Sequence, residues 1–167
     1  SYTVQAQQML PDVYRLDTAV IQGKRYLIAG NWANLSDHVV INPSYFRPAS
    51  WRIFAQVDHD TNDDWGSLLA PDYSFLDNIG KQPGGVDITP DWIDFGYNGA
   101  THVPNETGLT TNNSFDAMRT IWEVALDYQW NHTPEAHKYL VDACSFFTNQ
   151  YKATGKLATA YSYNGNI

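Results

Sequence analysis

The sequence predicts an all-α protein made of helical hairpins, and three observations support this fold class. Apolar residues recur at helical spacing in several stretches of the 167-residue chain. Long polar loops rich in Gly, Pro and Asp lead into residues that favour helix starts. No segment shows the sustained alternation of apolar and polar residues that is typical of a half-buried strand. We therefore expect a single helical domain over residues 1–167.

The N-terminal part of the chain contains two predicted helices and a short extended segment. Pro11 is expected to kink or restart the first helix, because proline cannot donate a backbone hydrogen bond. Asn42 followed by Pro43 is typical of an N-cap and the first turn behind it, so a second helix is expected to begin there. The expected elements are helices over residues 2–20 and 42–56, with an extended segment over residues 26–30 between them.

The acidic stretch from Asp58 to Asp64 begins like a calcium-binding loop, because aspartates occur at alternate positions. The glycine expected at the sixth position is Asp63, and the glutamate expected at the twelfth is Leu69. A solvated acidic turn is therefore preferred over a metal site. The five histidines include no helical pair with metal-ligand spacing, so we expect no metal and no cofactor.

The C-terminal part is expected to hold three further helices. Pro71 should kink the first of them, while Thr133 and Pro134 form a helix-start pair before the last. Cys144 is the single cysteine, so an intrachain disulfide is excluded, and a buried thiol is expected. The expected ranges are helices over residues 65–79, 115–130 and 134–152, a long loop over residues 81–99 and a non-helical tail over residues 158–167.

Composition and charge restrict the partners of the chain. The net charge of −8, without any basic run, argues against nucleic acid and against an anionic membrane surface, since both need clustered Lys and Arg. No apolar run approaches the roughly 18 residues of a membrane-spanning helix. Aromatic residues make up 14% of the chain, with six Trp and eleven Tyr, and such rings can stack on sugar faces. A neutral carbohydrate ligand is compatible with this composition.

Asp116 and Arg119 form the most informative pair of residues. Three positions apart on one helix face, the guanidinium favours the ionised carboxylate and can aim it. The polar loop over residues 105–113 leads into this segment, which places Asp116 in the first helical turn. Two interpretations stay open: a helix cap with a surface ion pair, or a catalytic carboxylate. Asp127, eleven residues further on, is expected to be structural and to pair with a neighbouring helix.

The segments Asn42–Ala49 and Phe115–Arg119, followed by Ala125–Tyr128, resemble glycoside hydrolase family 8 in order, spacing and helical context. Thr89–Ile93 is similar to a Pro-Asp-Trp loop of that family. The resemblance covers most of the chain and corresponds to the C-terminal half of the family's catalytic domain. It implies helical hairpins of an (α/α)6 barrel, incomplete in this chain, and a groove for β-1,4-linked polysaccharide. It also implies a secreted or periplasmic protein.

The family inverts the anomeric configuration, so one carboxylic acid protonates the leaving oxygen while a separate carboxylate activates water. By resemblance, Asp116 corresponds to the general base, Arg119 to the arginine that orients it, and Tyr45 to the tyrosine that contacts the attacking water. Without the resemblance, Tyr45 would be expected in the core. Cellulose or another β-glucan is the expected substrate, with xylan as the alternative.

The family's acid glutamate motif is missing from these residues. The glutamates of the chain are Glu106, Glu123 and Glu135, and none has the Glu-Gly context of that motif. The chain alone should therefore lack general acid catalysis, a loss of roughly 10²–10⁴-fold. We expect a complementary N-terminal half, or self-association, to cover the open side of a partial barrel. The alternative function is a non-catalytic carbohydrate-binding or scaffold segment.

Several aromatic residues are candidates for contact with a sugar. The loop-borne Trp32 and Trp92 are expected to be substrate platforms, because loop aromatics are less easily buried. Phe46 and Phe115 are further substrate-binding candidates. For the two helix-borne candidates core packing is favoured, and these are Trp51 and Trp122.

Overall fold

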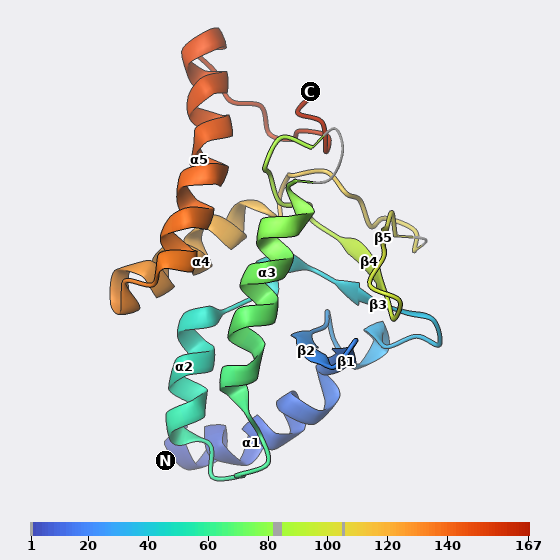
Figure 1. The fold of residues 1–167 in the computed structure, drawn as a ribbon, viewed down its shortest axis with the longest axis vertical. Helices are drawn as coiled ribbons and strands as arrows, with labels where there is room; N and C mark the ends of the chain where they lie inside the picture. Colours follow the sequence, from blue (N-terminus) through green and yellow to red (C-terminus); the bar gives the residue numbers. More distant parts are fainter. Residues whose placement is uncertain (1, 82–84, 105) are drawn as a thin grey trace.

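The computed structural model describes residues 2–81, 85–104 and 106–167. Helices dominate this part of the chain, which confirms the main feature of the predicted fold class. They are α1 (Tyr2–Leu16), α2 (Pro48–Val57), α3 (Leu69–Ile79), α4 (Met118–Asn131) and α5 (Pro134–Thr154). α4 packs on both α2 and α5, and α3 lies against α5 in the middle of the molecule (Figure 1).

Two small β-sheets correct the prediction of a purely helical protein. Each strand has four residues or fewer, too short to show an alternating pattern, and β4 is buried along its whole length. β1 (Thr18–Ile21) and β2 (Lys24–Leu27) form an antiparallel hairpin, and the second sheet is antiparallel in the order β3 (His38–Ile41), β4 (Ile93–Gly96), β5 (Thr101–His102).

The β1-β2 hairpin explains why the first predicted helix was too long. α1 ends at Leu16, and the β-branched residues that follow pair with β2 instead of extending the helix. Gln22 and Gly23 have φ angles of 51° and 76°, as the tight turn between two antiparallel strands requires. Pro11 lies inside α1 and does not restart it.

The predicted helix over residues 42–56 is divided into two pieces. Asn42 does cap a helical turn, because its side chain accepts a hydrogen bond from the backbone N–H of Ser44, but that turn is the single 3₁₀ turn η2 (Pro43–Tyr45). α2 begins only at Pro48. The physical reason is Pro48 itself, which disfavours the helical region for Arg47, whose φ and ψ are −130° and 67°.

The C-terminal predictions are closer to the structure. The helix expected over residues 65–79 is the 3₁₀ turn η3 (Trp65–Leu68) followed directly by α3, and α5 begins at Pro134 as expected. α4 begins at Met118, so Asp116 lies in the turn before the helix and not in its first turn. The loop predicted over residues 81–99 contains β4, and its residues 82–84 lie outside the described part of the chain.

The core is rich in aromatic rings contributed by α2, η3, α3 and the sheets. Trp51 is buried and stacks on Trp65 at 5.6 Å between ring centroids, which confirms the prediction that Trp51 is a core residue. Trp122 is 62% exposed and Cys144 is also exposed. The predictions that Trp122 packs in the core and that Cys144 is buried were therefore wrong. Both residues lie on outward faces of α4 and α5, where further apolar side chains are exposed, namely Trp130, Val141 and Tyr151. Within the described residues, no helix combines the length and the apolar character needed to cross a membrane.

Candidate active site

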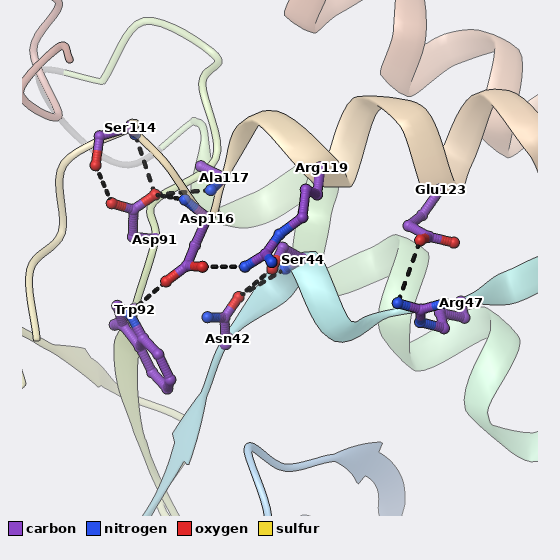
Figure 2. A network of polar contacts seen from close by, with 10 residues as sticks. All are labelled: Asn42, Ser44, Arg47, Asp91, Trp92, Ser114, Asp116, Ala117, Arg119 and Glu123. Atoms are coloured by element: carbon purple, nitrogen blue, oxygen red, sulfur yellow. Dashed lines mark hydrogen bonds and ion pairs between the residues drawn. The ribbon is translucent and has the colours of Figure 1, made fainter. Parts of the chain in front are cut away.

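The turn that precedes α4 is folded around the buried carboxylate of Asp91. One oxygen of Asp91 accepts hydrogen bonds from three backbone N–H groups, those of Ser114 at 3.0 Å, Asp116 at 3.1 Å and Ala117 at 2.7 Å, and the other accepts the Ser114 hydroxyl (Figure 2). These N–H groups lie at the start of a helix, where no intrahelical acceptor exists. Asp91 therefore caps α4 from another segment and fixes the backbone that carries Asp116.

The Asp116 side chain is held by two donors from different directions. Arg119 donates from its Nη2 atom to Oδ1, and the Trp92 indole Nε1 donates to Oδ2 at 2.9 Å (Figure 2). The ion pair predicted from the spacing of Asp116 and Arg119 is confirmed, although the helix starts later than expected. The Asp116 side chain remains 20% exposed, so its carboxylate is oriented but still reached by solvent.

Three aromatic side chains from separate segments gather beside this carboxylate. Trp92 precedes β4, Tyr45 ends η2, and Trp32 lies in η1 (Asn31–Ala33). The ring centroid of Trp92 is 6.0 Å from that of Tyr45 and 6.4 Å from that of Trp32. Trp32 is 51% exposed and Tyr45 is partly buried. The structure therefore brings together four of the predicted site residues around Trp92, namely Tyr45, Trp32, Asp116 and Arg119.

The two phenylalanines proposed as substrate contacts lie in different environments. Phe46 is completely buried and packs edge-on against Phe75 at 5.8 Å between ring centroids, so no ring face is left for a substrate. This corrects the expectation for Phe46, because the ring that follows η2 belongs to the aromatic core. Phe115 is 78% exposed, and the guanidinium carbon of Arg119 lies 5.7 Å from its ring centroid.

The glutamates of the chain serve other regions. Glu123 is buried and pairs with Arg47 at 3.4 Å, further along α4 than Arg119 (Figure 2). Glu135 lines a cavity of about 530 Å³ between α3 and α5, together with Arg52 and Lys138. Glu106 lies near His38. Glu123 and Glu106 thus have basic partners of their own, and Glu135 belongs to a separate cavity.

Metal-ligating side chains converge at one place in the described residues, on the sheet of β3 and β4. The ligand atoms of His38, Asp94 and Glu106 all lie within 4.8 Å of one another. The sequence pattern did not reveal this group, because its members come from three separate segments. In the acidic turn, by contrast, Asp58 accepts the Trp65 indole N–H at 2.6 Å and Asp64 accepts the Ser67 N–H at 3.1 Å, so these oxygens stabilise the turn itself.

Asp91 is the residue of this site to which sequence reasoning assigned no role. Its signal in the sequence is the Pro-Asp-Trp tripeptide, Pro90 to Trp92, which belongs to the family resemblance. In the structure two consecutive residues of that tripeptide both act on the Asp116 turn, Asp91 through the backbone and Trp92 through the carboxylate. Sequence alone does not show this, because the two segments are more than 20 residues apart and meet only in the fold.

Comparison with known proteins identifies the class of this protein. The family described as "Glycosyl hydrolases family 8" matches residues 1–164. Endoglucanase A of Acetivibrio thermocellus is 30% identical over 131 residues, which are 78% of this chain and 25% of that protein. A family 8 endoglucanase structure from Klebsiella pneumoniae is 25% identical with a TM-score of 0.63, covering 74% of this chain and 38% of the other. A β-1,3-1,4-glucanase from Paenibacillus sp. X4 shares the fold, with a TM-score of 0.80 at 16% identity over 99% of this chain and 44% of the other.

The chain is therefore a relative of glycoside hydrolases of the endoglucanase type. Within that class it belongs to glycosyl hydrolase family 8, because the family match extends over nearly all of its residues. The chain spans about a quarter of the length of Endoglucanase A and less than half of the two solved structures. Its fold is accordingly part of an (α/α)6-like barrel, with the small sheets described above.

Proposed function

We propose that this chain supplies the general-base part of an inverting hydrolase of β-1,4-linked polysaccharide. The observation that carries the proposal is the Asp116 carboxylate, which is oriented by Arg119 and Trp92 and lies beside exposed loop aromatics. A hydrolase that inverts needs a carboxylate base, a separate acid and room for a water between the base and the sugar. Asp116 has the exposure and the fixed orientation that the base requires.

In this mechanism Asp116 acts on a water molecule next to the anomeric carbon. Oδ1 accepts a hydrogen bond from Arg119 and Oδ2 accepts one from Trp92, and each oxygen keeps a further lone pair for the water. As the water oxygen bonds to the anomeric carbon, its proton passes to Asp116 and the glycosidic bond breaks. Tyr45, packed against Trp92, is the proposed hydroxyl that positions this water. The leaving oxygen takes its proton from an acid outside these residues.

The acid is proposed to come from a complementary segment that completes the barrel. The three glutamates of the chain are engaged elsewhere, and the chain spans only part of its relatives. The uncovered apolar faces of α4 and α5 support such a segment, as does an apolar hollow of about 550 Å³ lined by Phe115, Met118 and Tyr161. A second copy of the chain is the alternative covering for these faces.

The substrate is proposed to be a β-glucan such as cellulose, with xylan as the second choice. Trp32 offers an exposed indole next to Trp92, and stacking on such rings suits the flat faces of β-linked glucose units. The names of the relatives, endoglucanases and a β-1,3-1,4-glucanase, favour glucan. Because such polymers are too large to enter a cell, we place the enzyme in a secreted or periplasmic setting.

A second candidate function is a non-catalytic carbohydrate-binding or scaffold segment. One observation favours it, namely that the aromatic group of Trp32, Trp92 and Tyr45 is retained where no glutamate stands beside Asp116. In this case the ring platform binds sugar and the Asp116 pair only stabilises the turn before α4. The two candidates differ in whether the carboxylate of Asp116 matters for bond cleavage.

The proposal is tested by reducing-sugar release from β-glucan and xylan, with the chain alone and mixed with the complementary N-terminal part of a family 8 relative. We expect the chain alone to be at least 10²-fold less active than the mixture, because it lacks the acid. Asp116→Asn should remove the activity of the mixture, while Asp142→Asn, a matched change on the exposed side of α5, should leave it unchanged. Full activity of Asp116→Asn would contradict the assignment of the base.

Binding separates the catalytic proposal from the scaffold alternative. Affinity for cellohexaose, measured by calorimetry, should fall in Trp32→Ala and stay constant in Trp122→Ala, because both indoles are exposed but only Trp32 lies beside Trp92. Sugar binding without any cleavage, in the chain and in the mixture, would favour the scaffold. Equal binding by Trp32→Ala would contradict the proposed platform.

A further inference from the structure

A group of three metal-ligating side chains lies on the sheet formed by β3 and β4. His38 is the first residue of β3, Asp94 lies in β4, and Glu106 follows β5 in the chain. The antiparallel register pairs Asp94 with Val40. His38 stands two residues before Val40 on the same strand, so its side chain emerges on the same face of the sheet as that of Asp94.

The distances from Nε2 of His38 to the two carboxylates are close to the spacing of ligands around one ion. Nε2 of His38 lies 3.5 Å from Oδ2 of Asp94 and 3.9 Å from Oε1 of Glu106. A tetrahedral zinc ion with bonds of about 2.0–2.1 Å separates its ligands by about 3.4 Å. The distance from His38 to Asp94 already fits this ligand spacing, and the distance from His38 to Glu106 needs to shorten by about half an ångström. Glu106 can supply this shift, since it is the most exposed of the three at 32% of its side chain.

The second nitrogen of His38 completes the arrangement of a metal-binding imidazole. Nδ1 lies 2.8 Å from a carboxylate oxygen of Asp37, so this nitrogen donates and the ring is held in one orientation. Nε2 then points to the carboxylates of Asp94 and Glu106, and among the described residues it has no hydrogen-bond partner. A cation between Nε2 and the two carboxylates would give all three groups a partner. Metal-ligating histidines commonly donate their other N–H to a carboxylate in this way.

We propose that His38, Asp94 and Glu106 bind one divalent transition-metal ion of the zinc class. One imidazole with two carboxylates is a donor set for such an ion, while calcium and magnesium prefer oxygen ligands alone. Asp94 is nearly completely buried, at 2% exposure, and His38 is 15% exposed, so the site is partly shielded from water. The remaining position of a four-coordinate ion would be filled by water from the side of Glu106.

The ion would join β3 and β4 to the segment that leads into the Asp116 turn. That segment is already tied to the chain before β4, because Trp92 donates its backbone N–H to Thr110 at 3.0 Å and Asp91 donates to Asn112 at 2.7 Å. Coordination of the ion by Glu106 would hold the beginning of this segment against β3 and β4. The role inferred for the metal is structural, and the inference does not depend on the proposed hydrolysis.

The test is a zinc titration of the 167-residue chain after treatment with chelator, followed by competition with a chromophoric zinc indicator. We expect one ion per chain and a rise of several degrees in the melting temperature. His38→Gln and Glu106→Gln should each weaken zinc binding by at least tenfold. Asp37→Asn should also weaken it, by about tenfold, because it removes only the carboxylate that orients the ring.

Two matched variants control for binding at other sites. His59→Gln changes a histidine in the acidic turn, and Glu135→Gln changes a glutamate at the start of α5, so neither should alter the zinc affinity. Circular dichroism verifies that each variant is folded. A chain without saturable zinc binding would overturn the proposal. Zinc binding that survives His38→Gln but is lost in His59→Gln would overturn it as well.

Discussion

The two ends of α4 each carry an aspartate paired with an arginine, and they differ in what surrounds the pair. At the far end, Asp127 is completely buried and receives hydrogen bonds from Arg52 on α2 and from Tyr73 on α3 at 2.6 Å. Asn131 and Thr133 add two further donors. At the near end, Asp116 is 20% exposed and receives one donor on each oxygen, from Arg119 and Trp92.

The difference shows that one residue type is enclosed by the protein at one end of α4 and left open to solvent at the other. Burial raises the pKa of Asp127, but the hydrogen bonds from Arg52 and Tyr73 and the charge of Arg52 outweigh it, so the pKa is lowered overall. All its lone pairs are directed at the protein, and α2, α3 and α4 are joined through it. Asp116 keeps acceptor capacity toward solvent. The expectation that Asp127 is structural and pairs with a neighbouring helix is confirmed.

Among the variants at the two ends of α4, Asp127→Ala should lower the free energy of unfolding most. Removing one partner of a buried ion pair leaves the Arg52 guanidinium and the Tyr73 hydroxyl without their acceptor, and we expect a loss of about 3–5 kcal/mol in the free energy of unfolding. Urea denaturation followed by circular dichroism measures it. Asp142→Ala on the exposed face of α5 is the control and should change stability by less than about 0.5 kcal/mol. A loss at Asp127 no larger than the control would erase the contrast.

Asp91→Ala should have the next largest effect. It leaves three backbone N–H groups at the start of α4 without an acceptor, and we expect about 2–3 kcal/mol of destabilisation, since hydrogen bonds to a charged group are among the stronger ones. The same denaturation experiment measures this change. Ser114→Ala removes only the hydroxyl contact and should cost clearly less. If the two variants were equally stable, capping by Asp91 would not be the device that holds the Asp116 turn.

Asp72 in α3 sharpens the comparison, because it is a fully buried carboxylate that has one donor among the described residues, the Trp51 indole N–H at 2.9 Å. Burial raises its pKa well above the ordinary value, and the Trp51 hydrogen bond offsets this only in part. A raised carboxyl pKa means that the folded state holds a proton which the unfolded state releases. Stability should therefore fall as pH rises above about 4, with a slope of at most about 1.4 kcal/mol per pH unit from this group.

Asp72→Asn should remove that slope, since the amide does not titrate. The measurement is the free energy of unfolding between pH 4.5 and pH 7 in the variant and the unchanged chain. Asp127 acts in the opposite direction, because its lowered pKa stabilises the fold above the ordinary carboxyl range and this contribution is lost on acidification. An unchanged slope in Asp72→Asn would mean that other carboxylates set the pH dependence.

The smallest effect on stability should come from Asp116→Asn. The ion pair with Arg119 is partly exposed, at 39% for the arginine side chain, and such pairs contribute less than about 1 kcal/mol. Denaturation of this variant beside Asp127→Asn gives the direct comparison of the two ends of α4. A loss at Asp116 as large as that at Asp127 would assign it a structural role and weaken the proposal that it is the base.

Local signals in the sequence were sufficient for some parts of the fold and of the candidate site. Thr133 and Pro134 predicted the start of α5, and the spacing of Asp116 and Arg119 predicted their ion pair, because both depend on neighbours within one helical turn. The extended segment expected over residues 26–30 overlaps the end of β2, and the other strands were missed because each has four residues or fewer. Phe46 and Trp122 were assigned to the wrong environments, because the direction of a side chain depends on how elements pack and not on whether the residue lies in a loop or a helix.

The sequence by itself therefore determined the helical class, the family and the pair at the start of α4, all of which rest on periodicity, short motifs and spacing. Only the tertiary structure decided that Asp91 and Trp92 hold that pair, that Asp127 joins three helices, and that His38 meets Asp94 and Glu106. Each of these contacts joins segments far apart in the chain. Their closeness comes from burial of the apolar surfaces between them, which no local pattern encodes.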